Sequence, residues 1–398
     1  MRAHLLSNPN VQTTQAYELD GFCTATMRFA QLLKGLGWEV ILYASEENSA
    51  PCDELICTIT KKEQESILKG SPYQYATYSA SSALWTLSNA SIIREIEKRK
   101  RPNDFICSIG GASQMPVAEA HLDLMFVEYS VGYISSFSKY RVFESRVWQH
   151  TTHGFQDNIR GEFFEEVIPL FFDETKFKYN LPKENFALYA GRLTEKKGIE
   201  LACKAAKLAG IPLKVIGHGD PKLITDGAEY LGSVSDAERN EWMARASVFI
   251  CPTLYIEPFG SVAVEAQLSG TPVVSTPFGG FVETVEHGRT GYRCHTMDEF
   301  VRALHEAQSL NTKYIRNRAV SLYSMGAAAP QYQRYFERLL LSGGREFIGL
   351  ESYDNQEEVA EPGRSTIDPV SKTQLEPPAV SEGLQAEACA SVLQDAAE

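Results

Sequence analysis

Two glutamates with seven residues between them, Glu257 and Glu265, flank a stretch that could bind a phosphorylated sugar. We expect a helix from about Phe259 to Leu268, whose first-turn N–H groups form an anion site. The donors would be the N–H groups of Phe259, Gly260, Ser261 and Val262. Two carboxylates repel a simple phosphate, but each can accept hydrogen bonds from a sugar diol. A nucleotide sugar, with ribose, diphosphate and sugar in a row, therefore fits the pattern.

A plainer interpretation exists for both glutamates. Glu257 would be an acid favoured at a helix start, and Glu265 an exposed helix residue. Their spacing alone does not separate the two interpretations. The second half of the chain adds cations, because a strand at Phe186 to Tyr189 runs into a loop that contains Arg192 and Lys197. A guanidinium can form a fork on a phosphate and an ammonium supplies a point charge, although two ordinary surface cations would look the same.

Candidate residues of the first half follow its expected strands. Gly21 precedes a helix and could bring backbone close to a phosphate, although a plain turn explains it equally well. Glu128, Tyr129 and Tyr133 follow a strand at Leu122 to Val127, where open α/β sheets form their ligand crevice. His150 belongs to a His-x-x-His pattern that no nearby acid completes as a metal site, so we expect a structural or substrate-contacting role.

Strands and helices alternate along the chain, which predicts two α/β domains of the doubly wound kind. In the first half we expect strands at 2–6, 39–43, 55–58, 104–109 and 122–127, and helices at 22–36, 81–100 and 141–149. In the second half we expect strands at 186–189, 213–216, 248–251 and 272–275, and helices at 199–209, 235–246, 259–268, 298–308, 314–323 and 327–341. The domain boundaries that we predict are 1–172, 173–326, a last helix at 327–345, and a tail at 346–398.

Composition limits the class of protein. The chain has 398 residues and a net charge of −13, and the segment from Gly349 to Glu398 carries 11 acids against two bases. This tail is rich in Glu, Pro, Ser and Gln and is expected to be disordered. The remaining weak negative charge argues against nucleic acid as a partner. We expect no transmembrane helix and no signal peptide, and eight cysteines without a CxxC pair indicate free thiols in the cytoplasm.

Seven short motifs occur in register in the second half. They are Gly191-Arg-Leu…Lys197-Gly198, Gly217-x-Gly219, Leu231-Gly-Ser-Val, Pro252…Glu257-Pro-Phe-Gly…Glu265-Ala, Gly270-Thr-Pro-Val-Val, Gly279-Gly280…Glu283 and Gly288-x-Thr-Gly291. Together they resemble the C-terminal domain of retaining glycosyltransferases of family four. The resemblance covers roughly residues 186 to 295 strongly and the first half loosely.

The resemblance implies a GT-B fold, in which two Rossmann-like domains face a cleft. It implies that Arg192 and Lys197 hold the diphosphate, Glu257 the donor sugar and Glu265 the ribose, with the backbone at 259–262 near sugar or phosphate. A turn at Gly232, Ser233 and Val234 would border the base, and Gly21 would cover the phosphates. Transfer would keep the anomeric configuration and need no metal or other cofactor.

Three departures from the family pattern lie in the first half and at the domain junction. The family usually has a histidine after a first-domain strand, where this sequence has Phe126-Val-Glu-Tyr-Ser130. The usual Pro-Asn-Gly-Val-Asp reads Pro169-Leu-Phe-Phe-Asp173, and the glycine-rich loop is reduced to Gly21. Glu128, Tyr129, Tyr133 and His150 therefore remain candidates for contacts with sugar or acceptor.

The expected partners are a nucleotide-sugar donor and a saccharide or other hydroxyl acceptor, with peripheral membrane contact left open. Two alternatives to a glycosyltransferase remain. One is another GT-B enzyme such as a nucleotide-sugar epimerase, and the other is a non-catalytic nucleotide-sugar-binding or scaffold protein.

Overall fold

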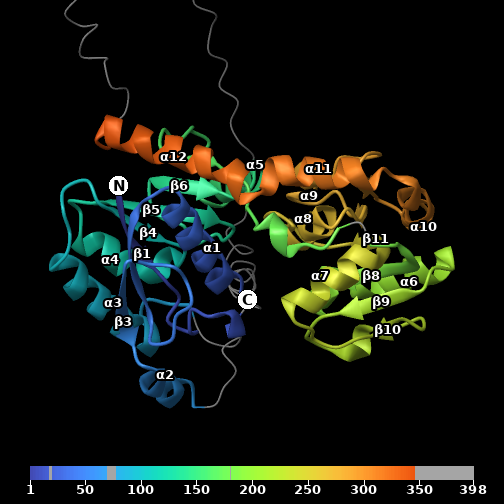
Figure 1. The fold of residues 1–398 in the computed structure, drawn as a ribbon, viewed down its shortest axis with the longest axis horizontal. Helices are drawn as coiled ribbons and strands as arrows, with labels where there is room; N and C mark the ends of the chain where they lie inside the picture. The colour runs from blue at the N-terminus through green and yellow to red at the C-terminus, as the bar shows by residue number, and fades with distance from the viewer. Residues whose placement is uncertain (18–19, 70–77, 180, 346–398) are drawn as a thin grey trace, which may run out of the picture.

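Two α/β halves lie side by side in the computed structural model, which describes residues 1–17, 20–69, 78–179 and 181–345 (Figure 1). Within these residues the first half contains a seven-stranded sheet in the order β3-β2-β1-β4-β5-β6-β7. Its strands are β1 (Arg2–Leu6), β2 (Glu39–Ser45), β3 (Glu54–Ile59), β4 (Phe105–Ser108), β5 (Met125–Val131), β6 (Tyr140–Phe143) and β7 (Glu166–Val167). Every pairing is parallel, so all strand ends of one kind lie at one edge.

The second half is built in the same way, with a six-stranded parallel sheet among the described residues in the order β10-β9-β8-β11-β12-β13. Its strands are β8 (Glu184–Ala190), β9 (Leu213–Ile216), β10 (Glu229–Tyr230), β11 (Ala246–Cys251), β12 (Val273–Ser275) and β13 (Gly291–Arg293). Both sheets are buried in the way that sheets covered by helices require, and β1, β11 and β12 are buried along their whole length.

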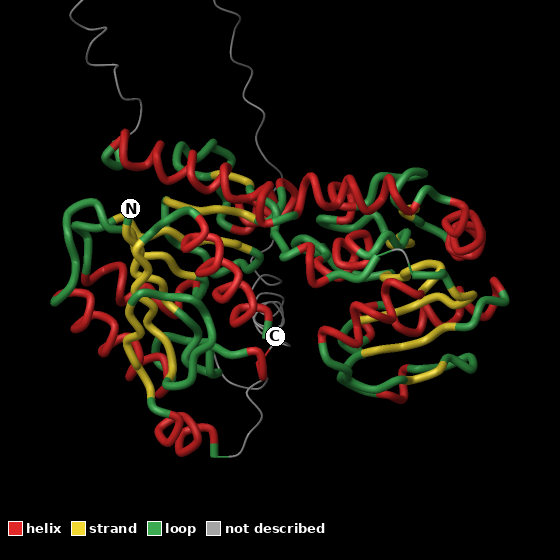
Figure 2. The backbone as a smooth tube through the Cα atoms, viewed as in Figure 1, coloured by secondary structure: helices red, strands yellow, loops and turns green. Residues whose placement is uncertain are grey.

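Helices cover both sheets (Figure 2). Those of the first half are α1 (Gly21–Gly35), α2 (Lys61–Leu68), α3 (Ala83–Glu97), α4 (Met115–Ala120) and α5 (Arg146–Phe155). Those of the second half are α6 (Ile199–Ala209), α7 (Asp236–Arg245), α8 (Ser261–Leu268), α9 (Phe281–Thr284), α10 (Met297–Glu306) and α11 (Thr312–Tyr323). The chain ends its described part in α12 (Met325–Ser342).

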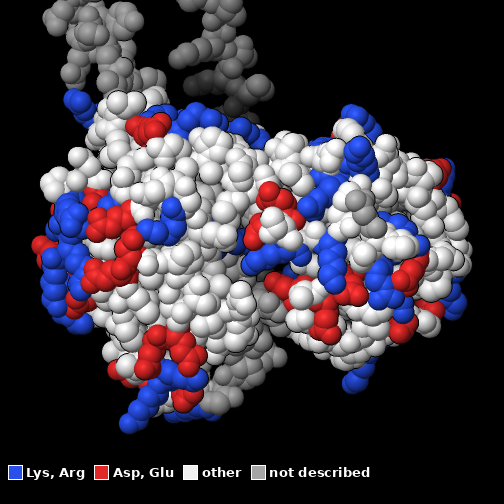
Figure 3. Space-filling model, in the orientation of Figure 1, with Lys and Arg blue, Asp and Glu red and all other residues white. Residues whose placement is uncertain are grey.

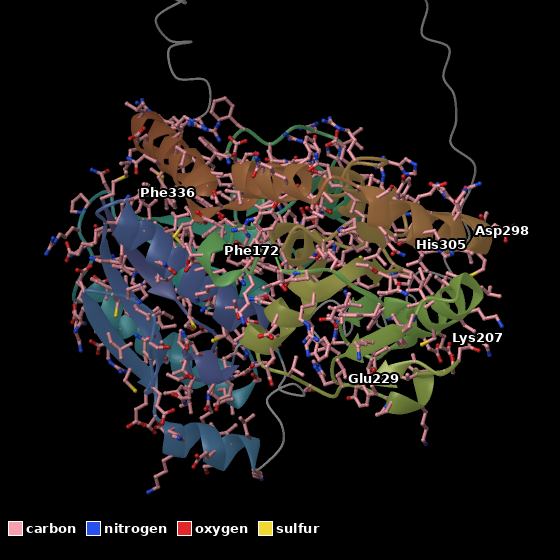
Figure 4. The ribbon with its side chains drawn as sticks, turned by 45° about the vertical axis from the view of Figure 1, so that its right-hand side comes forward. Phe172, Lys207, Glu229, Asp298, His305 and Phe336 are labelled. Carbon is pink, nitrogen blue, oxygen red and sulfur yellow. The ribbon has the colours of Figure 1, made fainter. Side chains whose placement is uncertain are left out.

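The last helix returns to the first half. Tyr332, Tyr335 and Phe336 of α12 are buried in the hydrophobic core that contains Phe29 and Phe105 of the first half. Figure 4 shows Phe336 over the first half and Phe172 in the region where the two halves meet. The chain therefore crosses between the halves twice, once on each side of the second sheet's elements.

The doubly wound α/β architecture expected from the sequence is confirmed in both halves. One local expectation is wrong: the helix expected at 141–149 is instead the end of β6 followed by α5. Ser145 explains the boundary, because its hydroxyl accepts a hydrogen bond from the N–H of Trp148 and so caps α5. The tail at 346–398 lies outside the described residues.

The surface carries both signs of charge on the face drawn in Figure 3, with basic and acidic side chains close to one another. The basic run at 98–101 fits this pattern, because Lys98, Arg99 and Lys100 all form ion pairs with neighbouring carboxylates. Among the described helices, none is both long enough and apolar enough to cross a membrane.

Candidate functional site

Loops that follow four parallel strands form one edge of the second sheet. They follow β8 at 191–198, β9 at 217–219, β11 at 252–260 and β12 at 276–280. Strands β8 and β11 are neighbours in the sheet, with β9 and β12 outside them. Because carboxyl ends of parallel strands share an edge, four stretches far apart in the sequence are brought together here.

Two glycines let these loops touch backbone to backbone. Gly198 has φ +70°, and a Cβ built on it would lie 2.0 Å from the carbonyl oxygen of Pro252. Gly279 has φ +67°, and its Cβ would lie 2.1 Å from the carbonyl oxygen of Glu257. Only glycine fits such positions, so these glycines set the position of the loop that carries Glu257.

Lys197 and Glu257 meet across two of the loops. The Nζ atom of Lys197 lies 2.8 Å from Oε2 of Glu257 and 4.8 Å from the ring centre of Tyr255. Burial by itself would lower the pKa of the Lys197 ammonium, but the charges and hydrogen bonds of Glu257 and Tyr255 together outweigh burial, and the pKa is raised. Lys197 is thus a fixed cation, held between a carboxylate and an aromatic ring.

Arg192 lies in the same loop as Lys197 and is half-buried. Burial and the positive charge of Arg192 lower the pKa of His218, which places the guanidinium near the loop after β9. That loop also reaches the predicted base-bordering turn, because the N–H of Gly217 donates to the carbonyl of Gly232 at 3.0 Å. Ser233 is exposed and Val234 is half-buried beside it.

Helix α8 begins at Ser261, two residues later than expected, with Gly260 at its N-cap. In the described residues, no hydrogen bond uses the N–H groups of Gly260, Ser261 or Val262. These are the N–H groups that an α-helix leaves open at its start. The side chain of Phe259 is buried against Phe172 and Tyr323, so only its backbone can take part in binding.

Glu265 has a different environment from Glu257. It is only 4% exposed, and its Oε2 atom lies 3.1 Å from the guanidinium of Arg239 on α7. Its Oε1 atom lies 4.0 Å from Arg28, which comes from α1 of the first half. The alternative of an exposed helix residue is therefore wrong, and Glu265 sits in a charged contact between the halves.

Gly21 is the first residue of α1 and is exposed. A Cβ at this position would meet nothing within 4 Å. The preceding Asp20 caps the helix by accepting a hydrogen bond of 2.7 Å from the N–H of Cys23. The space in front of Gly21 is therefore open, whereas the turn itself is stabilised by Asp20.

Glu128 and Tyr129 lie inside the first half, because β5 continues to Val131 rather than ending at Val127. Glu128 is fully buried, and one of its oxygens accepts hydrogen bonds from the N–H groups of Phe137 and Ser138, at 2.9 and 2.7 Å. Tyr129 is fully buried and stacked on Phe29 with 4.0 Å between ring centres. Neither side chain can be reached by a sugar acceptor in this structure, so the expectation that Glu128 and Tyr129 contact the acceptor is wrong. Glu128 instead holds the loop between β5 and β6.

Tyr133 is also buried, and its hydroxyl donates to Glu128 at 3.2 Å. Tyr133 lies in the loop between β5 and β6, and the expectation that it contacts the sugar or the acceptor is also wrong, because its side chain is buried. His150 is exposed on α5 and remains a candidate. Its neighbour His153 lies 2.8 Å from Glu165, which gives that histidine a structural partner.

Three polar residues at the junction were not predicted from the sequence to be site residues. Arg28 reaches Glu265 and lies over the ring of Phe172 at 4.5 Å. Glu283 of α9 accepts hydrogen bonds from the N–H groups of Arg146 and Val147, at 3.1 and 2.8 Å. Glu144 follows β6 and is close enough to Glu257 for the negative charge of Glu257 to contribute, after burial, to its raised pKa. Their partners lie in the other half of the molecule, so no local pattern marks them, although Glu283 is part of a recognised motif.

A hollow of about 560 Å³ borders this edge, because Pro277 of the loop after β12 is among the residues that line it. Its lining also includes Tyr292 and Arg293 of β13 and Glu299 and Arg302 of α10. No group of three or more His, Cys, Asp or Glu side chains within the described part of the chain has a metal-binding arrangement.

Comparison with known proteins finds a family model that matches part of the second half of the chain. Residues 171–319 match the family model described as glycosyl transferases group 1. The chain is 30% identical over 158 residues to a phosphatidyl-myo-inositol mannosyltransferase of Propionibacterium freudenreichii, a match that covers 36% of this chain and 41% of that protein. It is 36% identical over 123 residues to a D-inositol 3-phosphate glycosyltransferase of Pseudarthrobacter chlorophenolicus, covering 26% and 29%. The chain thus spans less than half the length of these relatives.

Solved structures match over more of the chain. A glycosyltransferase involved in avilamycin A biosynthesis has a TM-score of 0.64 at 20% identity, covering 86% of this chain and 98% of that one. Anabaena HepE, solved in complex with UDP and glucose, has a TM-score of 0.61 at 17% identity, covering 85% and 100%. The two-domain GT-B fold expected from the sequence is confirmed by these neighbours.

Proposed function

We propose that this chain, which has a GT-B fold and whose residues 171–319 match the family model described as glycosyl transferases group 1, moves a sugar from a nucleotide diphosphate to a hydroxyl acceptor. The observation that carries the proposal is the pairing of Lys197 with Glu257, 2.8 Å apart among the glycine loops. A fixed cation can bind a diphosphate and a carboxylate can accept hydrogen bonds from sugar hydroxyls, and both groups are present side by side.

The donor would lie along the carboxyl edge of the second sheet. Lys197 and Arg192 would bind the diphosphate, and Glu257 would accept hydrogen bonds from sugar hydroxyls. The open N–H groups at the start of α8 would face the phosphate or the sugar. The turn from Gly232 to Val234 would border the base, and Gly21 would approach the phosphates from the first half.

Glu265 would bind the ribose hydroxyls, as its family position implies. Its carboxylate is already 3.1 Å from Arg239 and 4.0 Å from Arg28. A ribose would therefore replace the longer contact, to Arg28, while the contact with Arg239 is kept. This exchange links donor binding to the position of α1 and hence of the first half.

The reaction would retain the anomeric configuration. The bond from the anomeric carbon to the diphosphate oxygen breaks, and the acceptor oxygen bonds to that carbon on the same face. The acceptor proton passes to the departing phosphate, so no enzyme nucleophile takes part. Lys197 and Arg192 would stabilise the charge that develops on the phosphate. Catalysis would then rest on positioning and electrostatics, and the proposed reaction uses no metal.

The setting of the reaction is also part of the proposal. Among the described cysteines, Cys23, Cys107, Cys203, Cys251 and Cys294 are buried free thiols, which supports a reducing compartment such as the cytoplasm. The acceptor would be a saccharide or another hydroxyl compound that enters from the first half.

A donor screen tests the proposal. Purified protein is incubated with UDP-glucose, UDP-N-acetylglucosamine and GDP-mannose, and released nucleoside diphosphate is measured with and without candidate acceptors. Lys197→Ala and Glu257→Gln are each expected to lower the turnover of the best donor by about 100-fold, the usual cost of one group that stabilises developing charge.

Two residues far from the site serve as matched controls. Lys207 pairs with Asp226 at 2.7 Å, and Glu229 pairs with Lys214; both are exposed, and Figure 4 shows them on the outer side of the second half. Lys207→Ala and Glu229→Gln should keep wild-type turnover. Tight donor binding without turnover would favour a non-catalytic binder, and interconversion of the sugar without acceptor would favour an epimerase.

A further inference from the structure

Glu144 lies beside a contact between the two halves. It is the first residue after β6, and Ser145 follows it. The hydroxyl of Ser145 donates a hydrogen bond to the carbonyl of Pro258, the residue after Glu257. Glu144 directly precedes Ser145, and Glu257 directly precedes Pro258, so both glutamates adjoin this hydrogen bond. Glu144 thus belongs to the short link between β6 and α5 of the first half, and Glu257 to the loop after β11 of the second half.

The carboxyl group of Glu144 rests on backbone. A Cβ built on Gly132 would lie 2.7 Å from its Oε2 atom, so any larger residue at 132 would collide with it. The side chain is only half-buried. Gly132 therefore leaves room for the Glu144 carboxyl group, which remains partly within reach of solvent.

No hydrogen bond among the described residues involves the Glu144 carboxyl. Two buried carboxyl groups of the first half, those of Glu128 and Glu165, do have hydrogen-bond partners. Glu128 accepts hydrogen bonds from two backbone N–H groups, and Glu165 binds both His153 and Gln149 at 2.8 Å. A carboxyl group that is partly removed from water without a partner costs stability. Glu144 thus offers an unused hydrogen-bonding group beside the proposed sugar site.

Burial and the negative charge of Glu257 raise the pKa of Glu144 to about 8. At pH 7 it is therefore mainly a neutral acid with one O–H donor. The ionisable groups around it are Glu257 with its partner Lys197, Tyr332 on α12, Tyr133 next to Gly132, and Arg146 at the start of α5. Burial raises the pKa of both tyrosines, so neither ionises near neutral pH.

We infer that Glu144 is a second sugar-binding carboxyl group, which donates a hydrogen bond from the first half to a hydroxyl of the donor sugar held by Glu257. The inference rests on the proposed function, because it needs a donor sugar beside Glu257. The two glutamates would then grip one sugar from opposite halves, Glu257 as acceptor and Glu144 as donor. A nucleoside diphosphate without sugar would not reach Glu144.

Charge explains why the pair works best when Glu144 is neutral. Lys197 balances Glu257, so a neutral Glu144 adds no charge to the subsite before the diphosphate arrives. When Glu144 ionises at higher pH, it loses its donor and places a second negative charge near Glu257 and the donor phosphates. Affinity for the sugar part of the donor should therefore fall as the pH rises through about 8.

Titration calorimetry on the full chain separates the sugar contact from the nucleotide contact. The probes are UDP-glucose against UDP and GDP-mannose against GDP, at pH 7 and pH 9. Glu144→Leu is expected to weaken the better nucleotide sugar about fivefold, as one hydrogen bond would, while its affinity for the nucleoside diphosphate stays unchanged. Glu144→Gln keeps an N–H donor and should bind like wild type at pH 7.

The pH dependence gives a readout that a purely structural residue would not change. Wild type should lose sugar affinity between pH 7 and pH 9 relative to the bare nucleoside diphosphate, and Glu144→Gln should not. Glu119→Gln, an exposed glutamate of α4 in the same half, removes one negative charge elsewhere and should behave like wild type. Thermal unfolding of each variant, with unchanged affinity for the nucleoside diphosphate, shows that the fold is intact.

The outcomes separate a failure of the proposed function from a failure of the role assigned to Glu144. If wild type binds neither a nucleoside diphosphate nor its sugar derivative, the proposed function and this inference both fail. If wild type binds the nucleotide sugar but Glu144→Leu binds it equally well, only the role of Glu144 is overturned. The same holds if wild type and Glu144→Gln lose sugar affinity in parallel at pH 9.

Discussion

Each of the two motif glutamates has its own electrostatic partner. Glu257 is paired with Lys197 and remains half-buried, whereas Glu265 is 4% exposed between Arg239 and Arg28. The same spacing therefore supplies one carboxylate that is accessible and one that is held inside a contact between the halves. In the first half, Glu128 shows a third use of a carboxyl group, which is to organise a loop.

A substitution series at Glu128 tests that structural role. Glu128→Leu leaves the N–H groups of Phe137 and Ser138 without an acceptor in the interior and should lower the free energy of unfolding by about 2–4 kcal/mol. Glu128→Gln keeps a carbonyl oxygen for both donors and should cost less than half as much. Urea unfolding measures both values, and equal stability of the Leu variant and wild type would contradict the role.

Titration of Glu128 adds a pH dependence to the same series. Burial raises its pKa from 4.5 to about 7. Between these values the folded state holds a proton that the unfolded state has released, so this group lowers stability as the pH rises from about 5 to 7. The effect is absent below that window and constant above it. Glu128→Gln should remove this slope, which urea unfolding at pH 5 and pH 7.5 would reveal.

At the scale of elements, glycines decide how closely the loops after β8, β11 and β12 approach. Gly198 lies on Pro252, and Gly279 lies on the backbone of Glu257. Hydrogen bonds between backbones complete the contact, from Leu254 to Lys196 at 2.8 Å and from Gly280 to Glu257 at 2.6 Å. The position of the Lys197–Glu257 pair is therefore a property of loop packing rather than of either side chain.

Gly279→Ala tests the importance of this packing. The added methyl group would collide with the carbonyl of Glu257, so the loop must shift and turnover should fall by more than tenfold. Gly227 is a matched control, because it also has a positive φ, +80°, but has nothing within 4 Å of a built Cβ. Gly227→Ala should cost only the left-handed strain, about 1 kcal/mol of stability, with turnover unchanged. Equal turnover of the two variants would contradict the packing argument.

At the scale of the whole molecule, polar contacts connect the halves near the proposed site. Figure 1 shows α5 and α9 close together at the junction. Glu283 of α9 caps α5, Ser145 binds the carbonyl of Pro258, and Arg28 reaches Glu265. Pro258 follows Glu257 directly, and Glu265 takes part in the contact with Arg28, so two of these three contacts involve or adjoin the glutamates proposed to bind the donor. Domain position and donor binding are therefore expected to depend on each other.

Hydrogen exchange can measure the α5 cap directly. Glu283→Gln replaces a charged acceptor at a helix N-terminus, which is worth about 1 kcal/mol. The amides of Arg146 and Val147 should then exchange several times faster in the ligand-free protein. Glu299 caps α10 of its own half through the N–H groups of His295 and Thr296. Glu299→Gln should leave the α5 amides unchanged, and unaltered exchange in Glu283→Gln would show that the cap carries no weight.

Local sequence determined much of the second half. The helix at 199–209 and the strand at 213–216 have the expected bounds. The helix expected at 235–246 is α7, which begins at a capping box formed by Ser235 and Glu238. These elements follow from periodicity and capping, which act within one or two turns. The order of the glycine and glutamate motifs was also sufficient to predict the GT-B fold. The roles of Arg192, Lys197, Glu257 and Glu265 in binding remain predictions.

Only the tertiary structure decided which side chains face the junction. Glu128 and Tyr129 were expected at a strand end, but β5 is longer and carries them into the core. Glu144 and Arg28 were not singled out, because each meets a residue more than 100 positions away in the other half. Such contacts arise from the packing of two domains, which no short stretch of sequence encodes. The sequence alone therefore determined the loops that carry the candidate donor site. The arrangement of the two halves determined which residues of the first half, such as Arg28 and Glu144, lie near these loops.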